Sequence, residues 1–380
     1  AAAPIAAGLA VPRNVHAAGS DRLRIGLIGC GGRGCGAAAS ALTVDPSVQL
    51  TAVADAFADR TEFARKTLKK KADQQVVIDD DHCFSGLDAY RKLLASGVVD
   101  VALLVEPPHF RPIHYAAAVQ AGKHAFLEKP CCVDAPGYRM LVAANEAAKQ
   151  KKLSVVVGLQ RRHQRNYLDG IQKIRDGAVG DVRFIRTYYN VQGGGRAGWL
   201  RPEGMSELEY QIRHWGIFCW LCGDHIPDPH VHNIDVINWF IGKYPEKAIG
   251  YGGRHRRVTG DQYDFFSVDF DYGLGVSSHS MCRQIDSCAN GTGEIIVGTE
   301  GYTNCQNTIW DPEGNVIWKF TYPNDENGNP TTTLKIPAYV QEHMHLVWAI
   351  RTGNYVNEGE QTALSTLTAI MGRTAAYTGR

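Results

Sequence analysis

The stretch LRIGLIGCGGRG at residues 23–34 decides the fold of this chain. Its apolar run at 23–29 indicates a buried strand, and a helical pattern follows the glycines at 36–42. The glycines have the spacing G-x-G-x-x-G, formed by Gly29, Cys30, Gly31, Gly32, Arg33 and Gly34. A strand that enters this motif and a helix that leaves it are the context that a dinucleotide-binding turn requires.

Each glycine of the motif meets a different steric need. Gly29 permits the tight bend, Gly31 removes the side chain that would block a pyrophosphate, and Gly34 lets the helix and the strand pack closely. The helix N-terminus then offers unpaired N–H groups and a partial positive charge to the phosphates. The motif therefore predicts a dinucleotide site rather than an ordinary glycine-rich turn.

An acidic residue ends the next expected strand, at 48–54. This residue is Asp55, about 20 residues beyond the last glycine, where a carboxylate can accept hydrogen bonds from a ribose 2′-OH. Since a 2′-phosphate would be repelled there, we expect NAD rather than NADP. Arg60, one helical turn further on, keeps NADP open.

Strand and helix patterns alternate through the first part of the chain. Besides the strands already described, apolar runs predict strands at 99–105, 124–127 and 154–157. Helical patterns lie at 57–71, 112–121 and 138–151. This alternation predicts an α/β domain with a parallel sheet and helices on both faces.

Short strands predominate after about residue 158. They are expected at 181–190, 248–251, 263–271, 275–281, 293–298, 308–310 and 316–322. Helices are expected at 228–241, 337–352 and 359–377, and residues 324–333 are the most loop-like stretch. We therefore expect a Rossmann domain at 21–158 and an α+β domain at 159–380 with an open, mostly antiparallel sheet.

Composition excludes several classes of protein. The chain has 380 residues, 44% of them hydrophobic, and a net charge of +1, so it is neither disordered nor basic enough to indicate nucleic-acid binding. After the first few residues no apolar run reaches the length of about 18 residues that a membrane span needs. The 10 cysteines are too sparse for a disulfide scaffold, and the lone Cys219-Trp-Leu-Cys222 lacks the second pair that a zinc site requires, so we expect no metal.

The first residues look like a processed leader. Residues 1–10 read AAAPIAAGLA, and Val15-His16-Ala17 fits the small-x-small rule for signal-peptidase cleavage. We expect residues 1–20 to be the remnant of an export signal, which would place the protein in the periplasm or outside the cell; a cytoplasmic location stays open. The alternative is an Ala-rich arm of the mature protein that packs on a neighbouring subunit.

Four motifs together resemble the Gfo/Idh/MocA oxidoreductases. They are RIGLIGCGGRG from Arg24, AGKHAFLEKP ending at Pro130, LQRRHQ at 159–164 and DPHVHNIDVINW at 228–239. The resemblance covers nearly all of the chain from Arg24 onward. It implies a Rossmann domain, a second domain on an open sheet, and an active site in the cleft between them. The leader also resembles a twin-arginine signal, although no Arg-Arg pair is present.

The resemblance assigns the catalytic residues. Lys129, just past a strand end, would polarise or deprotonate the reacting sugar oxygen. Asp228 and His232 would form a pair in which His232 is the general base and Asp228 orients it; Asp235, one turn on, is the alternative partner. From spacing alone, Asp228 and Pro229 equally fit the cap of a helix that carries an incidental histidine.

Other candidates are weaker. The cofactor contacts expected beyond the glycine turn and Asp55 are Pro107, His109, Glu128, Lys129 and Gln160. Many relatives have a small polar residue where this chain has Glu106, which leaves the details of these contacts open. The weak substrate candidates, of the stacking or hydrogen-bonding kind, are Arg161, Tyr189, Trp199, Arg213 and Trp215.

The resemblance implies an NAD-dependent oxidoreductase that acts on a hydroxyl of a sugar, polyol or glycoside. A redox glycosidase that recycles NAD is the alternative, and a non-catalytic NAD-binding sensor is a third class. The family also implies a homodimer or homotetramer, assembled through the open sheet.

Overall fold

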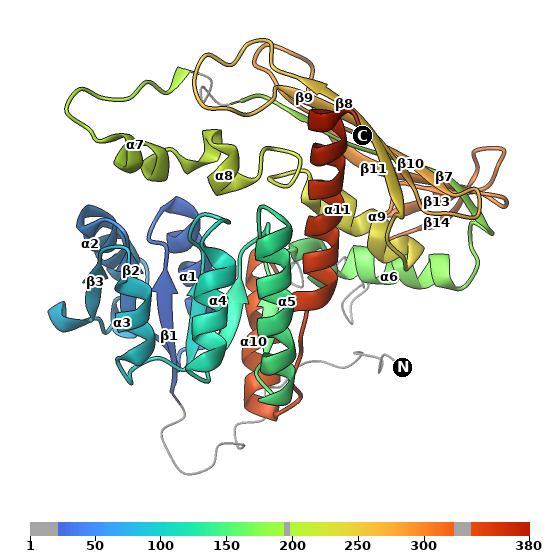
Figure 1. Ribbon diagram of the computed structural model, residues 1–380. Coiled ribbons are helices and arrows are strands. Elements are labelled where there is room, and N and C mark those ends of the chain that lie inside the picture. The colour runs from blue at the N-terminus through green and yellow to red at the C-terminus, as the bar shows by residue number, and fades with distance from the viewer. Residues whose placement is uncertain (1–21, 194–197, 323–335) are drawn as a thin grey trace.

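The computed structural model describes residues 22–193, 198–322 and 336–380, which form two sheets and the helices around them (Figure 1). The leader-like segment and the loop-like stretch at 324–333 lie outside the described residues. No helix in the described ranges is both long and apolar enough to cross a membrane.

The first sheet has six strands in the order β3-β2-β1-β4-β5-β6, and all its pairs are parallel. Its strands are β1 (Leu23–Ile28), β2 (Val48–Asp55), β3 (Cys83–Ser85), β4 (Val101–Leu104), β5 (His124–Leu127) and β6 (Val155–Val157). This is the Rossmann-type sheet that the alternation predicted. Strand β3 was not predicted, because this strand has only three residues and none of them is buried.

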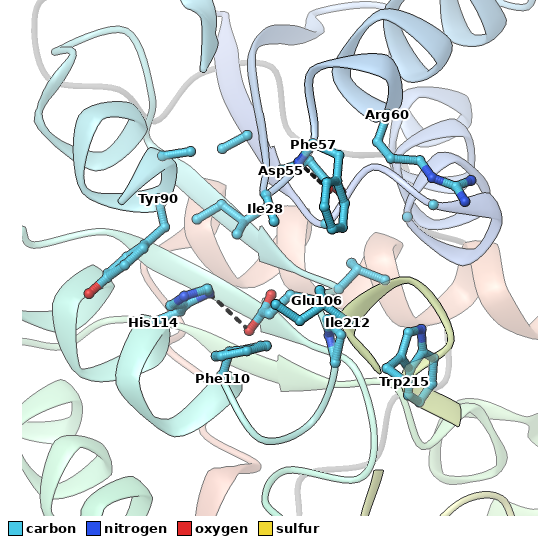
Figure 2. Close-up of a pocket in the computed structure, with 18 of the residues that line it drawn as sticks. Ile28, Asp55, Phe57, Arg60, Tyr90, Glu106, Phe110, His114, Ile212 and Trp215 are labelled. Carbon is cyan, nitrogen blue, oxygen red and sulfur yellow. Dashed lines mark hydrogen bonds and ion pairs between the residues drawn. The ribbon is translucent and has the colours of Figure 1, made fainter. Parts of the chain in front are cut away.

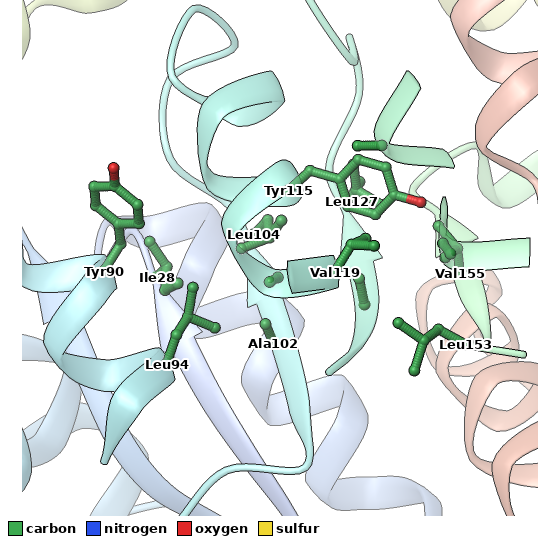
Figure 3. Packing of buried hydrophobic residues seen from close by; sticks show 14 of the residues in the cluster. Ile28, Tyr90, Leu94, Ala102, Leu104, Tyr115, Val119, Leu127, Leu153 and Val155 are labelled. Atoms are coloured by element: carbon green, nitrogen blue, oxygen red, sulfur yellow. The ribbon is translucent and has the colours of Figure 1, made fainter. Parts of the chain in front are cut away.

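Helices cover both faces of this sheet. They are α1 (Gly32–Val44), α2 (Ala58–Lys69), α3 (Ala89–Ala95), α4 (Arg111–Gln120) and α5 (Ala135–Gln150). One buried cluster joins the strands to α3, α4 and α5 through residues such as Ile28, Leu104 and Tyr115 (Figure 3). A second cluster lies on the opposite face, where Leu27 of β1 packs with Ala38 of α1.

The second sheet has eight strands in the order β14-β13-β12-β11-β7-β10-β9-β8. They are β7 (Val182–Val191), β8 (Lys247–Gly253), β9 (Phe265–Asp271), β10 (Ser277–Gln284), β11 (Gly291–Gly298), β12 (Tyr302–Thr303), β13 (Thr308–Trp310) and β14 (Val316–Lys319). Only β7 and β10 pair in parallel, so the sheet is mostly antiparallel, as expected.

The remaining helices connect the two sheets. They are α6 (Arg165–Arg175), α7 (Glu207–Arg213), α8 (Cys219–Cys222), α9 (Val231–Ile241), α10 (Ala338–Thr352) and α11 (Gly359–Thr378). Helices α9 and α11 pack against one face of the large sheet, while α7 and α8 lie across the carboxyl-terminal edge of the parallel sheet (Figure 1). Helix α10 returns to the Rossmann side, where Leu346 and Val347 join its core.

Candidate active site

The glycine turn has the geometry that its sequence predicts. Gly29 has a φ of +94°, and a Cβ on it would lie 2.4 Å from the backbone nitrogen of Glu106. A Cβ on Gly34 would lie 1.9 Å from the carbonyl oxygen of Gly29, whereas one on Gly31 would meet nothing within 4 Å. Gly29 and Gly34 therefore close the turn, and Gly31 leaves its outer side open.

The open side of the turn is suited to phosphate. Helix α1 begins at Gly32, and no side chain caps its N-terminus. The first N–H groups of a helix have no intrahelical acceptor, so here they are available to an anion. Cys30 is buried and does not face this space; its thiol contacts the carbonyl oxygen of Ala54 at 3.5 Å.

Asp55 borders the same turn from the end of β2. Its carboxylate accepts hydrogen bonds from the N–H of Cys30 at 2.7 Å and the N–H of Phe57 at 3.1 Å. Burial raises the pKa of Asp55, although these two bonds act in the opposite direction. Asp55 also lines a cavity, as a ribose-binding residue requires.

This cavity, of about 370 Å³, runs along the carboxyl ends of β1, β2 and β4 (Figure 2). From the Rossmann side it is lined by the glycine turn, Asp55, Arg60 and Pro107. Arg213 and Trp215 of the second domain close it from above. An open phosphate-binding turn, a carboxylate at the next strand end and an adjoining cavity fit a bound dinucleotide.

Lys129 and Asp228 meet between the two domains. The Lys129 ammonium donates a hydrogen bond to Asp228 Oδ1 at 2.5 Å, and both side chains are 14% exposed, so a ligand can still reach them. Burial opposes the charge on Lys129, but the carboxylates of Asp228 and Glu128 outweigh it and raise the pKa of Lys129. The lysine is therefore a fixed positive charge beside the cleft.

His232 lies in the first turn of α9, close to this ion pair. Burial, followed by the positive charges of Lys129 and Arg161, lowers the pKa of His232 well below its usual value. Its Nδ1 is buried and has no hydrogen-bond partner among the described residues. These effects keep the imidazole in its neutral form.

Two roles expected of Asp228 are wrong: it neither bonds to His232 nor caps the helix. Asp228 is bonded to Lys129 rather than to the imidazole, and it does not cap the helix, because α9 begins only at Val231 with His230 as its N-cap. Residues 225–230 form turns rather than the helical start that the spacing suggested, and the peptide bond between Asp228 and Pro229 is cis. Asp235 is not the partner either.

Asp235 belongs to a separate buried network. Both its oxygens accept hydrogen bonds from Arg162, at 2.7 and 2.8 Å, and Ser365 donates a third bond at 2.8 Å. This network fixes α9 to the segment after β6 and to α11. Asp235 therefore supports the helix that carries His232 without acting on the imidazole.

The neighbouring histidines have different partners. His225 bonds the carboxylate of Asp224 at 2.9 Å, and His230 Nε2 bonds Ser280 Oγ at 2.7 Å. Burial lowers the pKa of His230 to about 3. Across the described ranges, no group of three or more potential ligand side chains is arranged to hold a metal ion.

The other expected cofactor residues divide into two groups. Pro107 lines the cavity, but His109 does not; its N–H donates to the carbonyl oxygen of Leu221 at 3.0 Å and its ring packs against Trp220. Glu128 is paired with Arg33 and accepts a bond from the N–H of Lys129 at 2.9 Å. Glu128 and His109 thus make contacts with other residues of the protein around the site.

Gln160 follows β6 at the start of a short 3-10 helix that extends to His163. Its Oε1 is buried and makes no hydrogen bond within the described parts of the chain. It does not line the cavity beside the glycine turn, so contact between Gln160 and a cofactor stays a prediction.

The weak substrate candidates are dispersed. Arg161 is paired with the fully buried Glu294, and Tyr189 is near enough to Lys129 to raise its pKa. Arg213 stacks over Phe57 and bonds Asp59, so it belongs to the dinucleotide cavity, as does Trp215. Trp199 packs against His214 and does not line that cavity.

Sequence reasoning missed one link to the C-terminal part of the chain. Arg33 of the glycine turn contacts Glu342 of α10 at 3.3 Å and lies over the ring of Tyr339 at 4.4 Å. Burial raises the pKa of Glu342 well above its usual value. Because 309 positions separate the two residues, no local pattern could have shown this contact.

Comparison with known proteins agrees with this geometry. Residues 23–159 match the Gfo/Idh/MocA oxidoreductase family, which has an NAD-binding Rossmann fold. An inositol 2-dehydrogenase/D-chiro-inositol 3-dehydrogenase of Shouchella clausii is 29% identical over 237 residues, covering 60% of this chain and 57% of that protein. A glycosyl hydrolase family 109 protein of Streptomyces coelicolor is 27% identical over 190 residues, covering 48% and 39%. The chain spans about half the length of the curated relatives it matches.

Solved structures share the fold over most of the chain. Levoglucosan dehydrogenase in complex with NADH and levoglucosan has a TM-score of 0.72 at 17% identity, covering 94% of this chain and 98% of that one. The scyllo-inositol dehydrogenase of Lactobacillus casei, with bound NAD(H) and scyllo-inositol, has a TM-score of 0.68 at 20% identity and the same coverage.

Proposed function

The chain belongs to the Gfo/Idh/MocA oxidoreductases through its Rossmann domain, and from this premise we propose that it oxidises a secondary hydroxyl of a polyol or sugar with NAD. One observation carries the proposal. A charged lysine and a neutral imidazole, contributed by different domains, lie close enough for the lysine charge to lower the pKa of the imidazole, although neither lines the cavity beside the glycine turn. Hydride transfer from an alcohol needs a proton acceptor and a positive charge at the same oxygen.

His232 is the proton acceptor in this proposal. Its pKa is held low by burial, so the imidazole enters the reaction without a proton. His232 would take the proton of the reacting hydroxyl, and NAD, when bound, would supply the hydride acceptor.

Lys129 stabilises the negative charge that develops on the reacting oxygen. Asp228 keeps the ammonium protonated and fixes its position, since the two side chains share a bond of 2.5 Å. Arg161, which is paired with Glu294, is a second positive charge that lowers the pKa of His232.

The names of several relatives support a polyol or sugar substrate. Inositol dehydrogenases occur among the curated relatives and among the solved structures of the same fold. Incubation of the purified protein with NAD⁺ and a panel of inositols and aldoses, followed by NADH absorbance, tests the proposal directly. Net NADH formation with at least one polyol or sugar is the expected result.

A redox glycosidase is the second candidate, because one relative is named as a glycosyl hydrolase family 109 protein. In such an enzyme the sugar is oxidised transiently, a neighbouring proton is removed and the aglycone is eliminated. Aryl glycosides distinguish the two activities: aglycone release without net NADH would favour the glycosidase. A non-catalytic sensor would bind NAD and give neither product.

We further propose that the protein assembles through the outer face of the large sheet. Ile249 and Tyr251 of β8 are 66% and 70% exposed there, and Phe265 of β9 is 40% exposed. Contiguous apolar groups on an uncovered sheet favour a homodimer or homotetramer.

A further inference from the structure

A second carboxylate, Glu106, faces the dinucleotide cavity in addition to Asp55. Glu106 follows β4, lines the cavity and is only 5% exposed (Figure 2). Neither of its carboxylate oxygens has a hydrogen-bond partner among the described residues. Oε1 lies 3.4 Å from His114 Nδ1, a contact that is an ion pair only if the imidazole is protonated, while Oε2 has no hydrogen-bond partner among the described residues.

A buried carboxylate without a hydrogen-bond partner is costly, so its place in a binding cavity needs a reason. Leaving a buried acceptor unsatisfied costs about 1–3 kcal/mol, and more when the acceptor is charged. His114 offers only the contact of 3.4 Å to Oε1 and stacks on Tyr90 at 4.0 Å, while Phe110 and Tyr90 present rings to the cavity, so Oε2 stays without a donor among the described residues. A ligand that donates hydrogen bonds would satisfy it.

The order of the strands shows which part of a dinucleotide could be this donor. Along the sheet edge, Asp55 ends β2, the glycine turn follows β1, Glu106 follows β4 and Lys129 follows β5. A dinucleotide has the same order of groups: a ribose diol, a pyrophosphate, a second ribose diol and the nicotinamide. With the pyrophosphate at the turn and the reacting ring towards Lys129, the second diol falls at the end of β4.

We infer that Glu106 is a cofactor-recognition residue that accepts hydrogen bonds from the ribose hydroxyls on the nicotinamide side of NAD. Two carboxylates on either side of one phosphate-binding turn then match the two diols on either side of one pyrophosphate. The inference rests on NAD binding alone, and it stands whether or not the protein oxidises a polyol.

Calorimetric titration with three nucleotides tests the inference without any turnover. NAD⁺ and ADP-ribose both contain the second ribose, whereas ADP ends at the pyrophosphate. In Glu106→Gln, which removes the charge and one acceptor oxygen but keeps the shape, we expect about tenfold weaker binding of NAD⁺ and ADP-ribose and unchanged binding of ADP. Asp55→Asn should weaken all three.

Two results would overturn the inference. Glu106→Gln could bind ADP-ribose as tightly as the wild type, or it could lose ADP affinity to the same extent as ADP-ribose affinity. Glu62→Gln, which removes an exposed carboxylate from α2, is the matched control and should change none of the affinities. If Glu106→Gln does not fold, Glu106→Asp retains the charge but shortens its reach, and the same contrast between ADP-ribose and ADP applies. Failure of the wild type to bind NAD⁺ would contradict the cofactor itself.

Discussion

At Lys129, the residue types of the candidate site could be named from the sequence, but their contacts could not. The sequence identified Lys129, Asp228 and His232, but it paired Asp228 with the histidine. The structure pairs Asp228 with Lys129 instead, at 2.5 Å, and Asp228 lies before the start of α9. The resemblance named the three residues, whereas the partner of Asp228 depends on a contact between distant segments that the spacing does not encode.

This pairing predicts a change in pH dependence. In Asp228→Asn, the carboxylate that raises the pKa of Lys129 is lost while burial, which lowers it, remains. We expect the basic limb of kcat/KM to begin at lower pH than in the wild type. Asp169→Asn removes a partly exposed carboxylate of α6 and should leave the profile unchanged; an unchanged profile in Asp228→Asn would contradict the role of the ion pair.

Buried neutral histidines predict acid sensitivity. Burial lowers the pKa of His343 from 6.5 to about 3, and the side chain packs on Phe126 with neither ring nitrogen hydrogen-bonded among the described residues. Between these pH values the unfolded chain binds a proton that the folded chain does not, so stability falls as pH decreases below 6.5.

Denaturant unfolding at pH 7 and pH 5.5 measures this effect. A group of this kind contributes up to about 1.4 kcal/mol per pH unit. His343→Leu should therefore lose less stability than the wild type on acidification. Equal losses in the two proteins would show that His343 does not contribute.

Among the elements, the glycine turn was the best predicted, because strand, turn and helix are consecutive in sequence. Each glycine also has the steric role that the motif assigned to it. Four helices were missed, namely α3, α6, α7 and α8. Three of them, α3, α7 and α8, have seven residues or fewer, and a pattern needs more than two helical turns before its period is distinguishable from chance. The length of α6, 11 residues, does not account for its omission.

Two substitutions in the turn should separate folding from binding. Gly34→Ala places a Cβ 1.9 Å from a backbone oxygen, so we expect a lower Tm together with lost NAD affinity. Gly31→Ala meets nothing within 4 Å and should melt like the wild type, but its methyl group projects where the pyrophosphate would lie. Thermal melting and NAD⁺ titration measure both effects. Tight NAD⁺ binding by Gly31→Ala would contradict the placement of the pyrophosphate.

At the scale of the whole molecule, the two-sheet architecture was predictable, but the contacts between distant segments were not. Helix α10 follows the second sheet in sequence and packs on α1 of the first, where Glu342 reaches Arg33. The covering of the strand ends by α7 and α8 likewise depends on packing between segments that are far apart in sequence. Residues in and just after α7, which are Ile212, Arg213 and Trp215, complete the cavity; the sequence marked Arg213 and Trp215 as weak substrate candidates but did not place them at the dinucleotide cavity.

The uncovered sheet face predicts how copies assemble. Ile249→Asp together with Tyr251→Asp places charges on the exposed side of β8, and we expect a shift from dimer or tetramer to monomer. Light scattering coupled to size exclusion measures the mass. Phe63→Asp, at an exposed position of α2, is the control and should not alter it. A monomeric wild type, or a variant that keeps the wild-type mass, would contradict assembly through this face.

Single-turnover mixing of the NAD⁺-loaded protein with its polyol tests the central claim most directly. Lys129→Met and His232→Gln should each lower the rate of NADH formation by about 10²–10⁴-fold, the usual effect of removing a positioned acid or base, while NAD⁺ affinity stays near that of the wild type. Rates within about threefold of the wild type in either variant would contradict the account, because the reaction would then proceed without that residue as acid, base or oxyanion partner.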